Sequence, residues 1–207
     1  MTDHTPHASP QARHALAEDL PALEVALATA FADDPMISWV VGDGERERRI
    51  RVAAPGFFRP ALAAGIVRGH AYTVPDRSGA AIWSPPDVPM FREDEGMAFG
   101  TAIVEQLGEA AMHRLMALSE LVGSQHPRTE SHFYLFILGA AVQGRGVGAA
   151  VMRPVLDRCD ADRLPAYLES SSDRNVPFYE RLGFRITWTD RPTPDGPVLR
   201  GMWRDPR

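Results

Sequence analysis

The chain contains no lysine, and all 22 of its basic residues are arginine. With 27 acidic residues the formal net charge is -5, so the composition does not indicate a surface for nucleic acid. The single cysteine, Cys159, excludes a disulfide within the chain and a cysteine-rich zinc site. No stretch approaches the roughly 18–20 consecutive apolar residues of a membrane span, and polar residues 1–12 do not form a secretory signal. These absences predict a cytoplasmic protein that binds neither membrane nor nucleic acid.

The 207 residues are enough for one ordinary domain with a sizeable core. Hydrophobic residues make up 44% of the chain and charged residues 24%, which is typical of a soluble globular protein. We predict a loose, flexible N-terminal tail over residues 1–12 and a single domain over residues 13–207. The seven histidines include no pair four residues apart with an acid between them, so the sequence predicts no metal site.

Hydrophobic periodicity and turn residues predict a mixture of helices and strands. A first helix begins at Asp19, which caps it, and ends at Asp33-Asp34-Pro35, because a residue before proline avoids helical dihedral angles. Residues 44–64 are predicted to be helical in two parts that break near Pro55-Gly56, and residues 93–122 to be helical with an interruption at Gly108. The other predicted helices are 146–159 and 175–182, and the predicted strands are 71–74, 79–84, 132–141, 166–170, 184–188 and 198–203. The fold class is therefore α/β or α+β, with helices packed on a sheet.

A glycine-rich turn, Gln143-Gly144-Arg145-Gly146-Val147-Gly148, stands between the predicted strand 132–141 and the helix that follows it. Such a turn directs several backbone N–H groups at one point and adds the positive end of a helix dipole, which suits a pyrophosphate. Gly144, Gly146 and Ala149 fit a dinucleotide-binding pattern, and Glu169 lies where a ribose-binding acid is expected. Too few residues follow the turn to complete a doubly wound sheet, however, and taken alone the turn favours a simple bend.

A second motif, Asn175-Val176-Pro177-Phe178-Tyr179-Glu180-Arg181-Leu182-Gly183-Phe184, follows a short distance along the chain. It places a tyrosine near the end of a short helix, just before a Gly-Phe strand start. Over residues 131–188 the order is apolar strand, glycine turn, helix, a strand ending in Leu-Glu, and this motif. That order resembles the GNAT superfamily of acyl-CoA-dependent N-acetyltransferases. The resemblance implies a mixed, mainly antiparallel sheet of about six to seven strands flanked by helices.

The resemblance also implies acetyl-CoA as the cofactor. Backbone groups around the glycine turn would hold the pyrophosphate of coenzyme A, and Asn175 would contact its pantetheine or thiol end. A backbone N–H near Leu138–Ala140 would polarise the thioester carbonyl. The segment Leu138–Gln143 is shorter than the usual bridge of the family and lacks its proline, just where the thioester is presented. The implied cofactor-binding residues are Leu138, Ala140, Gln143, Gly144, Arg145, Gly146, Val147, Gly148 and Asn175.

Three further segments resemble one branch of that superfamily, the puromycin-type acetyltransferases and their relatives. These segments are Ala30–Pro35, Gly79–Pro86 and Pro165–Glu169. Resemblance to this branch implies a small-molecule amine as the acceptor, without implying that the acceptor is an antibiotic.

Acetyl transfer to an amine requires a proton donor for the departing thiolate and a base for the amine. Tyr179 is the candidate donor, and Glu169, at the cofactor end of its strand, is the candidate base. Asp33 and Asp34 end the first helix, where the family layout implies the acceptor site. Trp83 is a candidate for lining the acceptor pocket, although an aromatic residue in a strand more often belongs to the core. Each of these carboxylates has a plain alternative as a solvated surface charge.

Two functions of different classes stay open. The first is an acetyl-CoA-dependent N-acetyltransferase of a small amine, with direct attack on the thioester and with a protein N-terminus or side chain as the alternative acceptor. The second is an acyl-CoA-binding sensor or interaction module without efficient catalysis, which the shortened segment before Gln143 motivates. The apolar C-terminal strand with Met202 and Trp203 is a candidate homodimer surface.

Overall fold

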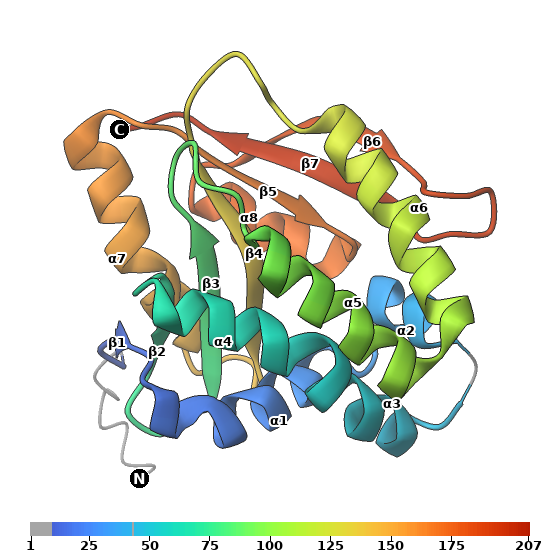
Figure 1. The fold of residues 1–207 in the computed structure, drawn as a ribbon. Coiled ribbons are helices and arrows are strands. Elements are labelled where there is room, and N and C mark those ends of the chain that lie inside the picture. Colours follow the sequence, from blue (N-terminus) through green and yellow to red (C-terminus); the bar gives the residue numbers. More distant parts are fainter. Residues whose placement is uncertain (1–9, 43) are drawn as a thin grey trace, which may run out of the picture.

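The computed structural model describes residues 10–42 and 44–207, which contain one seven-stranded sheet with helices on both faces (Figure 1). The strand order is β1-β2-β3-β4-β5-β7-β6. Every neighbouring pair is antiparallel except β4 and β5, which are parallel. This confirms the predicted mixed, mainly antiparallel sheet. The strands are β1 (Arg13–His14), β2 (Ala71–Thr73), β3 (Gly79–Ser84), β4 (Phe133–Ala140), β5 (Ala166–Ser170), β6 (Arg185–Asp190) and β7 (Leu199–Arg204).

The helices divide between the two faces of the sheet (Figure 1). One face carries α1 (Leu20–Ala30), α2 (Pro35–Val41), α3 (Arg46–Ala53), the π-helical turn η2 (Ala54–Phe58), α4 (Arg59–Val67), α5 (Glu93–Leu107) and α6 (Glu109–Gln125). The other face carries α7 (Val147–Asp162) and α8 (Val176–Arg181). Two short 3-10 helices, η1 (Ala17–Asp19) and η3 (Asp173–Asn175), precede α1 and α8.

Each face of the sheet has its own hydrophobic core, and β3 contributes to both because it is buried along its whole length. Ala80 and Ile82 face the core under α1 and α4, whereas Ala81 and Trp83 face the core under α7. This is the alternation that a pleated strand imposes on consecutive side chains.

Asp19 is at the start of α1 but does not cap it, so the prediction of its role is wrong. Its side chain accepts a hydrogen bond from the Leu16 backbone N–H at 2.9 Å, which closes the preceding η1 turn. It also pairs with Arg13 of β1 and with Arg77 in the turn between β2 and β3. These two guanidinium groups, Arg13 first, hold the pKa of this fully buried carboxyl far below its usual range.

The segment Asp33-Asp34-Pro35 ends the first helix as predicted, but it also starts a second one that the sequence did not reveal. Asp34 is the N-cap of α2, and its Oδ1 accepts hydrogen bonds from the backbone N–H groups of Met36 at 2.9 Å and Ile37 at 3.3 Å. Pro35 occupies the first helical position, where its missing N–H costs nothing. The chain therefore turns sharply at Asp34 and leaves its carboxyl in a fixed position.

The predicted break at Pro55-Gly56 is a π-helical turn between α3 and α4, so the helical path continues from Arg46 to Val67. By length and composition alone this 22-residue segment could cross a membrane, because an 18-residue stretch of it has a mean hydropathy of 1.3. Its arginines interrupt the apolar run, so the sequence did not reveal it. Half of that stretch is buried inside the protein, where Phe58 and Leu62 are fully enclosed, so the segment packs here as a core helix.

The two ends of the chain concern the predicted N-terminal tail and the predicted dimer surface on the C-terminal strand. Residues 1–9 of the predicted tail lie outside the described residues, while Ala12 packs against the core under α7. Strand β7 lies between β5 and β6, and Met202 and Trp203 are 0% and 7% exposed. Neighbouring strands and core side chains cover Met202 and Trp203, so these two side chains do not form an exposed dimer surface. The homodimer itself stays a prediction.

Candidate active site

Two cavities meet where the parallel strands β4 and β5 diverge. These strands pair from Phe133 with Ala166 to Leu135 with Leu168, and beyond that point β4 continues without β5 beside it. One cavity, of about 420 Å³, opens toward α7, and the other, of about 640 Å³, lies under α5 and α6. Ligands of open α/β sheets bind at the carboxyl ends of their parallel strands, and this is that place. Both cavities share a boundary made of Phe31, Asp34, Leu138, Asn175 and Tyr179.

A bulge in β4 helps to open this place. Ile82 pairs with Ile137 and Trp83 pairs with Leu135, so Phe136 is an extra residue on β4. Such a bulge bends the strand and changes which side chains face each core. Among the described residues no strand pairs with β4 past Leu135 on the edge that faces away from β3, and this part of β4 lines both cavities.

The first cavity is built around the glycine turn and the N-terminus of α7. Gly144 and Gly146 have φ angles of +80° and +74°, a backbone region that glycine adopts without strain. They let the chain reverse direction and start α7, a helix of 16 residues, directly at the cavity wall. The first turn of a helix has backbone N–H groups without helical partners and the positive end of the dipole. This end of the cavity therefore suits an anion.

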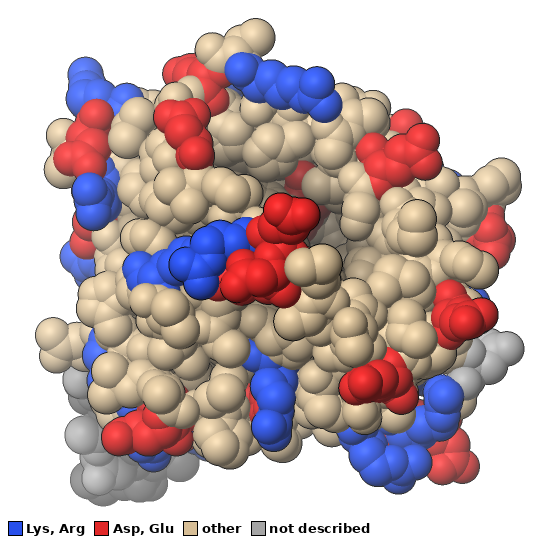
Figure 2. All heavy atoms as spheres, in the orientation of Figure 1, with Lys and Arg blue, Asp and Glu red and all other residues tan. Residues whose placement is uncertain are grey.

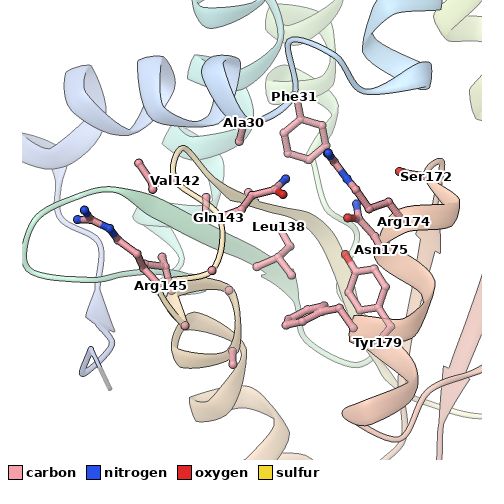
Figure 3. Close-up of a pocket in the computed structure, with 18 of the residues that line it drawn as sticks. Ala30, Phe31, Leu138, Val142, Gln143, Arg145, Ser172, Arg174, Asn175 and Tyr179 are labelled. Carbon is pink, nitrogen blue, oxygen red and sulfur yellow. The ribbon is translucent and has the colours of Figure 1, made fainter. Parts of the chain in front are cut away.

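Arginine side chains add charge of the same sign. Arg145, Arg174 and Arg181 line the first cavity, whose only acidic lining residues among those described are Asp33 and Asp34. Asp33 is paired with Arg46 and Arg49, which lower its pKa and neutralise its charge. The wall therefore has the chemistry of a site for phosphate groups. Figure 3 shows Arg174 at the end of the cavity where Asn175 and Tyr179 lie, and Arg145 pointing away from that end. Cationic groups therefore lie at both ends of the cavity.

Tyr179 projects from α8 into the shared boundary, where it lies beside Asn175 and opposite Leu138 (Figure 3). It is 7% exposed, and burial, followed by the nearby charge of Asp34, raises the pKa of its phenol well above the usual value. Phe178 and Phe184 pack around its ring. A phenol in this environment keeps its proton at neutral pH, which is the state that a proton donor needs.

Asp34 lies on the same boundary and is held from several sides. In addition to capping α2, its carboxyl accepts a hydrogen bond from the Ser171 hydroxyl, at 2.7 Å to Oδ2 and 2.9 Å to Oδ1. Burial raises the pKa of Asp34, and the hydrogen bonds from Ser171 and α2 oppose that rise. Asp34 thus joins the end of β5 to the start of α2, and it is a fixed acidic group rather than a free base.

Glu169 lies in the second cavity on β5, two residues before Ser171. Its Oε2 accepts a hydrogen bond from the Tyr134 hydroxyl at 2.7 Å, whereas its buried Oε1 makes no regular hydrogen bond with any described residue. Burial raises the pKa of Glu169 to about 7, and the phenols of Tyr134 and Tyr167 limit the rise. A carboxyl with this pKa exchanges protons near neutral pH, which suits a general base.

His126 is the nearest nitrogen base to this carboxyl, with Nδ1 at 4.0 Å from Oε1 of Glu169. Burial, helped by His132 and Arg128, lowers the pKa of His126 to about 4. The imidazole is therefore neutral near pH 7 and does not form an ion pair with Glu169. It packs edge-on against the rings of Tyr134 and Tyr167, which keeps the carboxyl in apolar surroundings.

Comparison with known proteins gives the family of this fold. Residues 93–202, more than half of the chain, match the acetyltransferase (GNAT) domain family. The chain belongs to the GNAT acetyltransferases. It is 26% identical over 185 residues to an uncharacterized N-acetyltransferase of Schizosaccharomyces pombe, a match that covers 84% of this chain and 73% of that protein.

Solved structures of other GNAT proteins share the fold. A histone acetyltransferase HPA2 and related acetyltransferase from Corynebacterium glutamicum is 23% identical, with a TM-score of 0.65 over 97% of this chain and 98% of that one. An agmatine N-acetyltransferase mutant is 14% identical, with a TM-score of 0.60 over 96% of this chain and 100% of that one. The dinucleotide-binding alternative is excluded, because the sheet has a single parallel pair rather than a doubly wound parallel core.

This GNAT structure brings together most residues that the sequence singled out. All nine predicted cofactor-binding residues line the first cavity, together with Asp33, Asp34 and Tyr179. Glu169 lines the second cavity. Trp83 is the exception: it is 1% exposed, packs in the core under α7 and lines neither cavity. Its predicted place in the acceptor pocket is wrong, because the alternation of β3 turns its side chain to the other face of the sheet.

Several residues that line this GNAT site were not predicted from the sequence. Arg174 and Arg181 flank the recognised tyrosine motif, so their proximity to it was a usable indication of a phosphate site. Tyr134 and His126 approach Glu169 from a different strand and from the end of α6, and no pattern in the sequence links the three. The aromatic wall of Phe57, Phe91, Phe99 and Phe136 comes from η2, α5, β4 and the segment before α5, so it likewise forms only on folding.

Proposed function

We propose that this protein is an acetyl-CoA-dependent N-acetyltransferase of a small-molecule amine, in which the amine attacks the thioester directly. The observation that carries the proposal is the shared boundary at Tyr179. On one side lies a cationic cavity at a helix N-terminus, and on the other an apolar cavity with a raised-pKa carboxyl. Solved structures of the same fold include N-acetyltransferases of small amines, among them agmatine N-acetyltransferase and a Drosophila melanogaster polyamine N-acetyltransferase.

The residues of the first cavity fit coenzyme A. Its pyrophosphate matches the first-turn N–H groups of α7 after Gly146, and its remaining phosphate matches the arginines of the wall. The space beside the turn is open at Gly144, where a Cβ atom would meet no other atom within 4 Å. A phosphate group therefore has room to approach the backbone. Asn175 and Leu138 lie at the boundary, where the reactive end would extend.

The proposed reaction distributes the chemistry among this chain's own groups. Acetyl-CoA, when bound, supplies a thioester whose carbonyl carbon forms the new C–N bond as the C–S bond breaks. Glu169 accepts the proton of the amine, directly or through one water, because its pKa lies near neutral pH. A backbone N–H group of β4 beyond Leu135, where the pairing with β5 ends, stabilises the charge that develops on the carbonyl oxygen. The Tyr179 hydroxyl donates its proton to the departing sulfur.

The test is calorimetry with acetyl-CoA and with desulfo-CoA, followed by a thiol-release assay over a panel of amines and short peptides. We expect both cofactor forms to bind and small amines to release thiol. Absence of binding by either form at millimolar concentration would contradict the proposal. Tight binding without thiol release from any acceptor would favour a sensor instead, and release with peptides alone would favour a protein acceptor.

A further inference from the structure

The second cavity has a wall of aromatic rings. Phe91 and Phe99 are stacked with their centroids 4.9 Å apart. Phe57 meets Phe99 edge-on at 5.4 Å, and Phe136 of β4 meets Phe91 edge-on at 5.6 Å. All four residues line the cavity, which Leu115, Leu118 and Met112 extend along α6. Rings that hold one another in this way give a rigid apolar surface.

Charge is confined to one end of this cavity. Asp34 and Glu169 are its only charged lining residues within the described ranges, and no arginine or histidine lines it there. The two carboxyls lie at the same end, because Ser171, two residues after Glu169, hydrogen-bonds to Asp34. That end is the boundary shared with the first cavity, where Asn175 and Tyr179 also lie. The rest of its lining, between α5 and α6, is uncharged among the described residues.

Small residues keep the far end of the cavity open. Gly96 and Gly100 on α5 line it beside Phe91 and Phe99, whereas Gly123 on α6 lies one helical turn before His126 and so nearer the Glu169 end. A Cβ built on Gly123 meets nothing within 4 Å, and one built on Gly96 meets only the Cβ of Phe91, at 3.9 Å. Figure 2 shows the surface hollowed near the middle of the face that α5 and α6 occupy, with acidic and basic side chains along part of its rim. There is therefore space for the body of a ligand beyond the carboxyl end.

We infer that the acceptor is an apolar monoamine, a primary amine on an aryl or alkyl body without a second charge; this rests on the proposed function. The amine lies at the Asp34 and Glu169 end, where Oε1 of Glu169 has no regular hydrogen-bond partner among the described residues. The apolar body lies against the phenylalanine wall and gains free energy from leaving water. A second ammonium or guanidinium group at the far end would lose its hydration without gaining a partner. The cavity thus selects against diamines and agmatine-like acceptors.

A matched pair of amines tests the inference. Hexylamine and 1,6-diaminohexane have the same carbon chain and differ only in one terminal charged group. With acetyl-CoA at saturation we expect kcat/KM for hexylamine to exceed that for the diamine by about tenfold or more, because an unpaired buried charge is costly. Equal or better use of the diamine would overturn the inference. Such a result would leave the proposed acetyl transfer intact, since both outcomes require thiol release.

Variants of the cavity wall locate the effect. Gly96→Leu fills the far end, so it should raise KM for hexylamine several-fold while leaving propylamine nearly unaffected; Ala98→Leu, on the exposed side of the same helix, is the control. Gly96→Glu places a carboxylate at the same end and should narrow the preference for hexylamine over 1,6-diaminohexane, whereas Ala98→Glu should not. If neither change at the wall alters selectivity while both variants remain folded by circular dichroism, the acceptor does not lie in this cavity.

Binding measurements keep the inference independent of turnover. Hexylamine and 1,6-diaminohexane are titrated by calorimetry into the protein saturated with coenzyme A. Preferential binding of hexylamine that Gly96→Leu weakens supports the ligand class even if no amine is acetylated, in which case only the proposed function fails. Absence of hexylamine binding, with coenzyme A bound, overturns the ligand class.

Discussion

At the scale of single residues, the site depends on one carboxyl whose surroundings disfavour its charge. Glu169 is enclosed by the aromatic rings of Tyr134 and Tyr167 and by neutral His126. Desolvation raises its pKa to about 7, while the Tyr134 phenol stabilises whatever charge it carries. Asp34, by contrast, is committed to capping α2 and to Ser171. The two acids at the boundary therefore have different parts: Glu169 exchanges a proton and Asp34 fixes the geometry.

The pH dependence of activity tests the part of Glu169. Since the deprotonated carboxylate is the base, kcat/KM should rise as pH increases through about 7. Glu169→Gln keeps the shape and can still accept from Tyr134, but it cannot take a proton. We expect it to lower kcat by roughly a hundredfold and to remove the step near pH 7. A variant profile that retains that step would show that another group is responsible.

The same pKa predicts how stability changes with pH. The folded-state pKa is raised from 4.5 to about 7, so the contribution of Glu169 is fully present below 4.5 and is lost as pH rises through 7. Glu169→Gln has no such loss. The free energy of unfolding of Glu169→Gln, minus that of the parent protein, should therefore increase between pH 5 and pH 8, by at most about 3 kcal/mol. Urea denaturation at both pH values measures this, and an advantage independent of pH would contradict the assignment.

Tyr179→Phe separates proton donation from packing. The ring remains between Phe178 and Phe184 and only the hydroxyl is lost. We expect kcat to fall on the order of a hundredfold, with acetyl-CoA affinity nearly unchanged. An equal fall in affinity, measured by calorimetry, would indicate a packing role instead. Phe178→Leu is the matched control, since it changes the packing beside Tyr179 and leaves the hydroxyl in place.

At the scale of elements, the critical unit is the turn that launches α7. Gly146 has a φ angle of +74°, and α7 begins at the next residue. The first turn of this helix can aim its free N–H groups into the cavity only if the chain reverses at this point. The segment Leu138–Gln143, which the resemblance predicts to be a shortened bridge, lines the cavity at five of its six positions.

Gly146→Ala should weaken acetyl-CoA binding as well as stability. A non-glycine residue at this positive φ costs about 1–2 kcal/mol, and the strain displaces the turn from the geometry that binds an anion. Gly69→Ala is the matched control, because Gly69 has a φ of +69°, its Cβ would meet nothing within 4 Å and it lines neither cavity. Both variants should lose similar stability in thermal denaturation, and only Gly146→Ala should lose affinity. Equal affinity losses would show that the turn has no special part in binding.

At the scale of the whole molecule, one sheet joins β1 at residue 13 to β7 at residue 204, and both cavities lie on its divergent centre. Strands on both sides of the divergence, β3 and β7, belong to the same sheet as β4 and β5. We therefore expect the predicted single domain to unfold in one transition that responds to ligand as a unit.

Thermal unfolding with acetyl-CoA tests this expectation. A ligand at one hundred times its dissociation constant stabilises the folded state by about 2.7 kcal/mol. For a chain of this size, the single transition should move upward by roughly 5–10 °C. Two transitions, of which only one moves, would contradict the single domain from residue 13 to residue 207.

The sequence by itself determined the local parts of the site. The apolar strand, the glycine turn and α7 follow one another without interruption, and short-range rules for strands, positive φ and helix starts suffice to place them. The tyrosine motif is equally local. For this reason the nine predicted cofactor-binding residues all line one cavity. The interruption between α5 and α6 at Gly108 was predictable as well, because a glycine at the end of a helix is a local signal.

Only the tertiary structure decided the acceptor side. Its wall combines residues from α2, η2, α5, α6, β4 and β5, which are separated by long stretches of chain. Alternation along a strand shows which residues share a face of the sheet but not which helices cover that face. For this reason Trp83 was predicted to line the acceptor pocket, whereas it packs in the core under α7. The extra residue Phe136 in β4, and the contact of Tyr134 with Glu169, depend on pairing between distant strands. Local sequence fixes the backbone that binds an anion, whereas non-local packing determines how the carboxyl is buried and which amine can reach it.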